Sequence, residues 1–247
     1  CSVVSPGCTN CYAMRLAGTR MKDHPSRAGL TIDSKSGPVW NGQVRFNEDW
    51  LTQPLRWRRP RNIFVCAHGD LFHENVPDAW IDKVFAVMAL APQHTFQVLT
   101  KRPARMLDYL SRNDVSLLRN WSMAFEPGTF ILTQHEIEAW LCPFARPAHR
   151  GLYRAKQVHA PLPNVLLGVS VEDQTRADER RDHLAPLARR HGWRTFVSYE
   201  PALGPVDWIG WEFLSWLISG GESQKGSRPS HPDWHRTARD FCAENGI

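Results

Sequence analysis

The chain has 247 residues, of which 42% are hydrophobic, and a formal net charge of +5. This length and composition suffice for one domain with a full core, so we expect a single domain over residues 1–247. No stretch approaches the roughly 20 consecutive apolar residues of a membrane span, and the start lacks a signal-peptide pattern. We therefore expect a soluble, cytoplasmic protein without membrane contact. The modest positive charge permits a nucleic-acid partner but does not require one.

Predicted strands and helices alternate along the chain. Apolar and β-branched runs predict five strands, over residues 62–67, 95–99, 164–170, 194–198 and 214–219. Capping residues and amphipathic patterns predict helices over residues 10–21, 77–91, 103–110, 173–190 and 232–244. This order is typical of an α/β fold, and we expect a partial parallel βα barrel of the TIM type. The segment 116–163 interrupts the alternation and is interpreted as an insertion or a lid.

Three of the six cysteines, Cys1, Cys8 and Cys11, crowd the start of the chain. The cysteines are too few and too unevenly spaced for a disulfide framework, so a metal-binding cluster in a reducing compartment fits better. Thiolates are soft ligands for iron-sulfur clusters, zinc and copper. Three protein ligands leave one coordination position open. A [4Fe-4S] cluster can use that position for a small molecule, whereas a structural zinc site closes it with another Cys or a His.

Polar residues follow each predicted strand at its carboxyl end. In parallel α/β proteins, ligands bind at this edge of the sheet. For any one of these residues, capping of the next helix is the simpler explanation, but five polar strand ends together favour a site. Two glycines in the last turn allow close backbone approach to a ligand. The candidates are His68, Asp70, Lys101, Arg102, Ser170, Glu172, Gly220, Gly221 and Glu222.

Several motifs in chain order carry a family resemblance. They are the cysteine loop with Tyr12, Asp70 to Glu74, Phe96 to Pro103, Leu167 to Asp173, Glu200-Pro201 with Gly204-Pro205, and Gly220 to Ser223. Together they resemble the uncharacterised phage-associated family named after phage gene products thirty-seven and sixty-eight. That family is similar, more distantly, to radical S-adenosylmethionine enzymes, including the spore photoproduct lyase branch.

The second resemblance implies a chemistry. Cys1, Cys8 and Cys11 would each bind one iron of a [4Fe-4S] cluster, and the fourth iron would chelate S-adenosylmethionine. An electron donor would drive cleavage to a 5'-deoxyadenosyl radical that acts on an unknown substrate, with nucleic acid as one candidate. The enzyme would be a lyase or an oxidoreductase. The resemblance also implies a strand before Cys1 and another after Ile247, so that the chain would be truncated at both ends.

The resemblance divides the strand-end residues into two groups. Residues that would hold polar groups of S-adenosylmethionine are Ser170, Glu172, Gly220, Gly221 and Glu222. Residues that would contact the substrate, and so act in catalysis, are His68, Asp70, Lys101 and Arg102.

Other interpretations of the cysteines stay open. A structural zinc site could add His24 as its fourth ligand, which would make the chain a nucleic-acid-interacting phage protein without catalysis. Alternatively, Cys1 could act as an N-terminal nucleophile in an amidohydrolase.

A basic run could also contact nucleic acid. Its arginines could bind phosphates of DNA or RNA while its tryptophan stacks on a base, although such runs are more often solvated loops. The residues are Arg56, Trp57, Arg58, Arg59 and Arg61.

Overall fold

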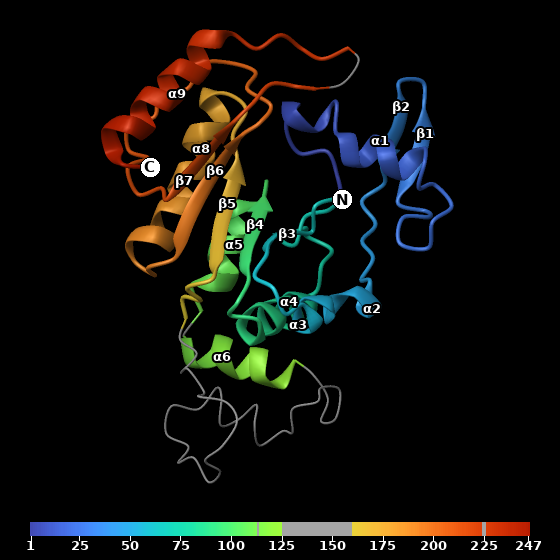
Figure 1. Ribbon diagram of the computed structural model, residues 1–247. Helices are drawn as coiled ribbons and strands as arrows, with labels where there is room; N and C mark the ends of the chain where they lie inside the picture. The colour runs from blue at the N-terminus through green and yellow to red at the C-terminus, as the bar shows by residue number, and fades with distance from the viewer. Residues whose placement is uncertain (113, 125–159, 224–225) are drawn as a thin grey trace.

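The computed structural model describes residues 1–112, 114–124, 160–223 and 226–247 (Figure 1). Its centre is a parallel five-stranded sheet in which neighbouring strands follow one another in the sequence. Sequential order places every crossover helix on the same side of the sheet, so that the sheet curls into a half barrel with an open inner face. The strands are β3 (Asn62–Val65), β4 (Thr95–Thr100), β5 (Val165–Ser170), β6 (Arg194–Tyr199) and β7 (Trp216–Ser219).

Alternation along the strands separates a packed face from an open one. Val98, Val165 and Val197 are fully buried in the main core. Alternate positions such as Phe64 and Ser198 instead line a cavity. Because successive side chains of a strand point to opposite faces, each strand contributes both to the core and to the cavity wall.

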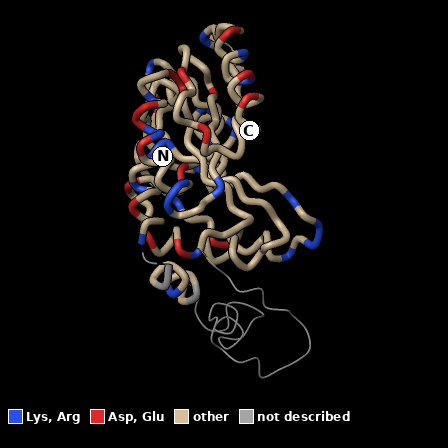
Figure 2. The backbone as a smooth tube through the Cα atoms, turned by 90° about the vertical axis from the view of Figure 1, so that its left-hand side faces the viewer, with Lys and Arg blue, Asp and Glu red and all other residues tan. Residues whose placement is uncertain are grey.

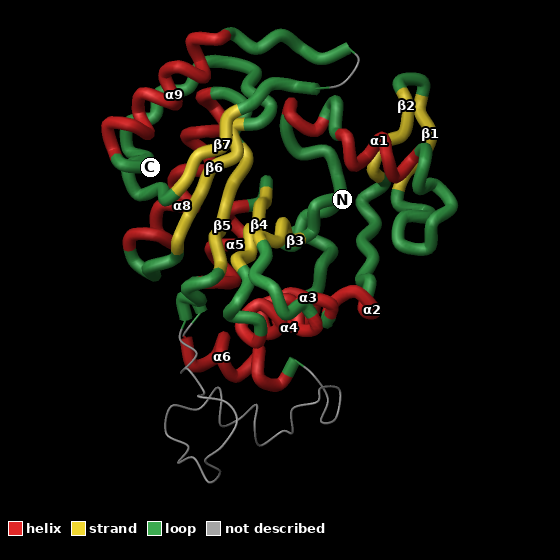
Figure 3. Tube along the Cα trace, viewed as in Figure 1, coloured by secondary structure: helices red, strands yellow, loops and turns green. Residues whose placement is uncertain are grey.

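Helices cover the outer face of the sheet (Figure 3). Ile81, Phe85 and Met88 lie fully buried on one helix and join the core beneath the strands. Asp173 caps the longest helix, since its side chain accepts a hydrogen bond from the Arg176 amide. The covering helices are α4 (Asp78–Leu90), α5 (Pro103–Leu110), α8 (Gln174–Arg189) and α9 (Pro232–Asn245). Helix α6 (Asp114–Met123) packs on α4 below the sheet in Figure 3.

The first part of the chain forms a small unit beside the sheet (Figure 1). The cysteine loop contains a 3-10 turn, η1 (Pro6–Cys8), and is followed by α1 (Tyr12–Gly18). The hairpin of β1 (Thr31–Ser34) and β2 (Gly37–Trp40) packs on α1. Helices α2 (Glu48–Leu51) and α3 (Gln53–Arg56) lead back to the sheet. No helix or strand was predicted between residues 21 and 62, so β1, β2, α2 and α3 were missed.

The prediction of an α/β fold with a partial parallel barrel is confirmed. The sheet forms a half barrel and not a complete TIM barrel. The five predicted strands are all present, with ends that differ by a few residues. Most of the proposed insertion or lid, 116–163, lies outside the described residues. Its beginning belongs to α6, whose Leu117 and Trp121 are buried in the main core. Among the described residues, every helix is too short or too polar to cross a membrane.

Candidate functional site

A cavity of about 540 Å³ opens at the carboxyl ends of the strands. Its volume falls within the roughly 300–1,000 Å³ of small-molecule sites. All three clustered cysteines line it, together with most of the polar strand-end residues predicted from the sequence. The predicted residues that line the cavity are Cys1, Cys8, Cys11, His68, Asp70, Lys101, Arg102, Ser170, Gly221 and Glu222.

Glu172 is placed differently, because it is fully buried and does not line the cavity. Its carboxylate accepts a hydrogen bond from Ser5 Oγ at 2.7 Å, and it forms ion pairs with Arg180 at 2.8 Å and Lys101 at 3.2 Å. Burial raises the pKa of Glu172, but Lys101 and Arg180 outweigh it and keep the pKa below its ordinary value. A Cβ added at Gly7 would lie 2.5 Å from this carboxylate, so the backbone of the cysteine loop packs directly against the Glu172 side chain.

Glu222 holds the other side of the cysteine loop. Asn10 Nδ2 donates to its carboxylate at 2.9 Å, and the Arg228 amide donates to it at 2.8 Å. The Arg228 guanidinium pairs with the same carboxylate and also donates to the Pro6 carbonyl at 2.9 Å. Hydrogen bonding by Arg228 lowers the pKa of Glu222 to about 2. Glu222 therefore touches the cavity and also positions the loop.

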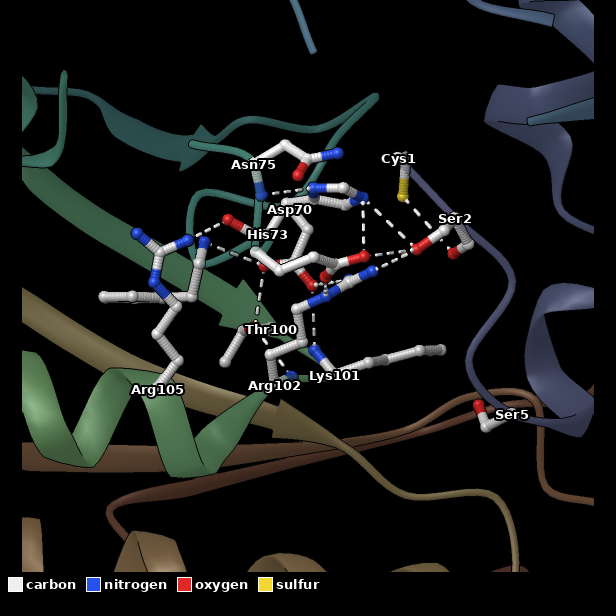
Figure 4. Close-up of polar contacts among 12 residues, drawn as sticks. Cys1, Ser2, Ser5, Asp70, His73, Asn75, Thr100, Lys101, Arg102 and Arg105 are labelled. Carbon is white, nitrogen blue, oxygen red and sulfur yellow. Dashed lines mark hydrogen bonds and ion pairs between the residues drawn. The ribbon is translucent and has the colours of Figure 1, made fainter. Parts of the chain in front are cut away.

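Arg102 fixes the beginning of the chain (Figure 4). Its guanidinium forms ion pairs with Asp70 at 2.9 Å and with Glu74 at 2.6 Å, and donates to Ser2 Oγ at 2.5 Å. Asp70 also accepts a hydrogen bond from Thr100 Oγ1 at 2.7 Å, which connects the loop after β3 to the last residue of β4. The structure thus engages Asp70 and Arg102 in contacts within the protein, and substrate contact by these two residues stays a prediction.

His68 contacts Tyr12, directly after the cysteine loop, and Arg27, from the segment between α1 and β1. Its Nδ1 is 3.1 Å from Arg27 Nη2, and its ring meets Tyr12 edge-on with centroids 5.8 Å apart. Burial and the neighbouring Arg27 lower the pKa of His68, so the imidazole is neutral near pH 7. A neutral ring can accept or donate a proton within the cavity.

The cysteine loop brings three thiols to one cavity, and their binding of an iron-sulfur cluster stays a prediction. Cys8 is 8% exposed, and Cys1 and Cys11 are partly exposed, with all three thiols on one cavity. Each thiolate of a [4Fe-4S] cluster binds a different iron, so the sulfurs surround the cluster instead of a single ion. Within the described ranges, no group of three or more His, Cys, Asp or Glu is arranged around a single metal-ion position.

Glu200 is a cavity residue that the sequence analysis did not include among its site candidates. It is exposed, follows β6 and lines the cavity beside Ser198. A Cβ added at Gly220 would lie 3.2 Å from its carboxylate, so Gly220 contributes space next to Glu200 although it does not line the cavity itself. The sequence feature that could have identified Glu200 is its position at the end of a predicted strand, directly before Pro201.

Residues of the basic run do not line the cysteine cavity. Its arginines are exposed, and Arg61 stacks over the Trp57 ring at 4.4 Å from the centroid. Elsewhere Lys and Arg are interspersed with Asp and Glu (Figure 2). His24, the proposed fourth zinc ligand, has its Nδ1 2.7 Å from Ser26 Oγ and does not line the cysteine cavity.

The fold and the site define an α/β protein with a cysteine-lined cavity at the carboxyl edge of a parallel half barrel. Over residues 1–247 the chain matches the family described as "Protein of unknown function (DUF5131)", and it belongs to that family. Comparisons with curated proteins and with solved structures gave no match.

Proposed function

We propose that this protein is a radical S-adenosylmethionine enzyme of the phage-associated family that its motifs resemble. The observation that carries the proposal is that Cys1, Cys8 and Cys11 line one cavity with the polar ends of the parallel strands. Ligand sites of parallel α/β proteins lie at this edge. The half barrel and the three-cysteine loop are also the features that the resemblance to radical S-adenosylmethionine enzymes implies.

The residues of the chain divide the work in the proposed site. Cys1, Cys8 and Cys11 would hold a [4Fe-4S] cluster, which when bound supplies the electron that cleaves S-adenosylmethionine reductively. Ser170, Ser198 and Glu200 line the cavity, and their hydroxyl and carboxylate groups would bind the amine and hydroxyl groups of that cofactor. Gly221 leaves room for close backbone approach.

Apolar side chains complete the cavity. Leu99, Phe196 and Ile218 come from three different strands and line its wall. They would limit the access of water to reactive species, which is the main contribution that a protein makes to cofactor chemistry besides binding and orientation. An external electron donor would reduce the cluster.

The test is anaerobic reconstitution with iron and sulfide. We expect a brown protein that absorbs near 400 nm with about four irons per chain. Replacing Cys1, Cys8 or Cys11 with Ala should abolish the absorbance, whereas Cys242→Ala on α9 should not, since Cys242 does not line the cavity. Formation of 5'-deoxyadenosine under reduction is the second readout. A colourless protein with one tightly bound zinc would contradict the proposal.

A further inference from the structure

A second cavity of about 470 Å³ adjoins the cysteine cavity. It lies between the edge strand β3 and the helices α2, α3 and α4. The two cavities share a boundary formed by Cys1, Trp40, Phe64, Cys66, His68 and Asp70. A ligand in the second cavity would therefore lie directly beside the proposed cluster.

Aromatic side chains dominate the walls of this second cavity. Trp50 and Phe64 are each 43% exposed and line the same cavity, so a ligand in that cavity could cover both rings. Phe46 and Trp80 stack on one another with centroids 5.0 Å apart in the same wall. Flat apolar surfaces of this kind suit a planar ring such as a nucleobase.

Arg27 gives the cavity a positive charge without a counter-ion. Its Nη1 donates to the Ser26 carbonyl at 2.9 Å and its Nη2 lies 3.1 Å from His68, but its buried Nε has no partner. Across the described part of the chain, no carboxylate lies within ion-pair distance of Arg27. Because a guanidinium stays charged, a partly buried one without an acidic partner favours an anionic ligand. Asp70, the acidic residue of the boundary, is already paired with Arg102.

The basic run continues from the cavity to the surface. Trp57 lines the cavity, and the next residues, Arg58 and Arg59, are exposed. Neither forms an ion pair with any described residue. Cationic side chains that start at an aromatic wall can follow a phosphate backbone while a base enters the cavity.

We propose that the second cavity binds one unstacked base of single-stranded nucleic acid. The base lies between Trp50 and Phe64, a phosphate binds Arg27, and neighbouring phosphates bind Arg58 and Arg59. This names the substrate class for the cysteine site, and the chemistry at the base rests on the function proposed above. Binding itself does not require the cluster. A base stacked in a duplex cannot reach this cavity, so single strands should be preferred.

The test is fluorescence anisotropy with fluorescein-labelled DNA and RNA strands of about 12 nucleotides. We expect both to bind at least tenfold more tightly than the matching duplex. The Arg58→Ala/Arg59→Ala variant should weaken binding and lower the slope of log Kd against log salt concentration by roughly 1.4, as expected for two lost phosphate contacts. Trp50→Ala and Phe64→Ala should each weaken binding roughly fivefold or more, with the slope unchanged.

Matched controls make the outcome decisive. Arg236→Ala/Arg239→Ala removes the same charge from α9, which lies far from α2 and α3 in Figure 1, and should bind as the unmodified protein does. Trp50→Phe keeps an aromatic face and should restore most of the affinity. Equal weakening by both arginine pairs, or full binding by Trp50→Ala and Phe64→Ala, would overturn the proposal. The protein should bind the strand equally well before and after reconstitution with iron and sulfide, so a failed reconstitution and a failed cavity are distinguishable.

Discussion

Glu172 and Glu222 face the cysteine loop from two sides and hold it through different residues. Glu172 binds Ser5, and Glu222 binds Asn10. Arg102 adds a third contact at Ser2. The sequence analysis assigned both carboxylates to cofactor binding, but the contacts of Glu172 make it a positioning residue. At the residue scale, the loop is held by charge-assisted hydrogen bonds, which are about twice as strong as neutral ones.

Replacement of Glu172 by Gln should destabilise the protein. The change leaves Arg180 and Lys101 without their buried counter-ion, and breaking such a pair costs roughly 3–5 kcal/mol. Urea unfolding should show this loss, and the reconstituted variant should retain less iron because the charge-assisted hydrogen bond from Ser5 becomes a weaker bond to a neutral amide. Glu179→Gln on α8 is the matched control, since Glu179 is 61% exposed and should cost under about 1 kcal/mol. Equal effects of the two changes would contradict the positioning role.

The pKa of Glu222 predicts an acid-sensitive contact. Its folded-state pKa of about 2 lies below the ordinary value of 4.5, so the carboxylate stabilises the fold above about pH 4.5 and loses this contribution as the pH falls toward 2. The thermal midpoint of the unmodified protein should therefore decrease over this window. In Glu222→Gln the midpoint should be lower at pH 7 and should decrease less on acidification. A parallel pH profile of the two proteins would rule out this contribution.

At the scale of elements, close packing within the sheet shapes the cavity. The ring of Phe196 from β6 packs directly against Gly168 of β5. The same ring stacks on Trp216 of β7, with the ring centroids 5.5 Å apart. The same ring forms part of the cavity wall. A glycine in β5 thus allows an aromatic residue of the next strand to lie flat across the inner face of the half barrel.

Gly168→Ala should displace that ring. The added Cβ would lie 2.3 Å from Phe196 Cε1, and overpacking of this kind costs roughly 1–3 kcal/mol. Chemical denaturation should measure the loss. Gly204→Ala is the control, because its Cβ would come no closer than 3.5 Å to a neighbour. The variant Gly168→Ala/Phe196→Leu, which removes the clash, should recover part of the lost stability, and a further decrease would argue against this packing account.

At the scale of the whole molecule, the proposed function couples cofactor binding to stability. A ligand that binds only the folded state at about 100 times its Kd stabilises that state by about 2.7 kcal/mol. S-adenosylmethionine should therefore raise the thermal midpoint of the reconstituted protein. It should raise the midpoint much less in the Cys1→Ala variant, which lacks a cluster ligand. An equal increase in both proteins would show that the cofactor binds without the cluster.

Strand positions and strand-end residues could be predicted because they depend on local patterns. The apolar run of β5 is buried at every position, and its polar end at Ser170 reaches the cavity as expected for parallel strands. The hairpin of β1 and β2 could not be predicted in the same way. Its strands have only four residues each, β2 begins with Gly37 and Pro38, and the hairpin is stabilised by packing against α1.

The sequence by itself determined the α/β class, the three clustered thiols and the polar ends of the strands, because periodicity and spacing are properties of neighbouring residues. Only the tertiary structure decided which of those groups face the cavity. Glu172 and Ser170 lie two residues apart, yet the first is paired beneath the cysteine loop and the second lines the cavity. The second cavity with Arg27 likewise depends on segments that are far apart in the chain. Such contacts arise from long-range packing and charge pairing, which no local pattern specifies.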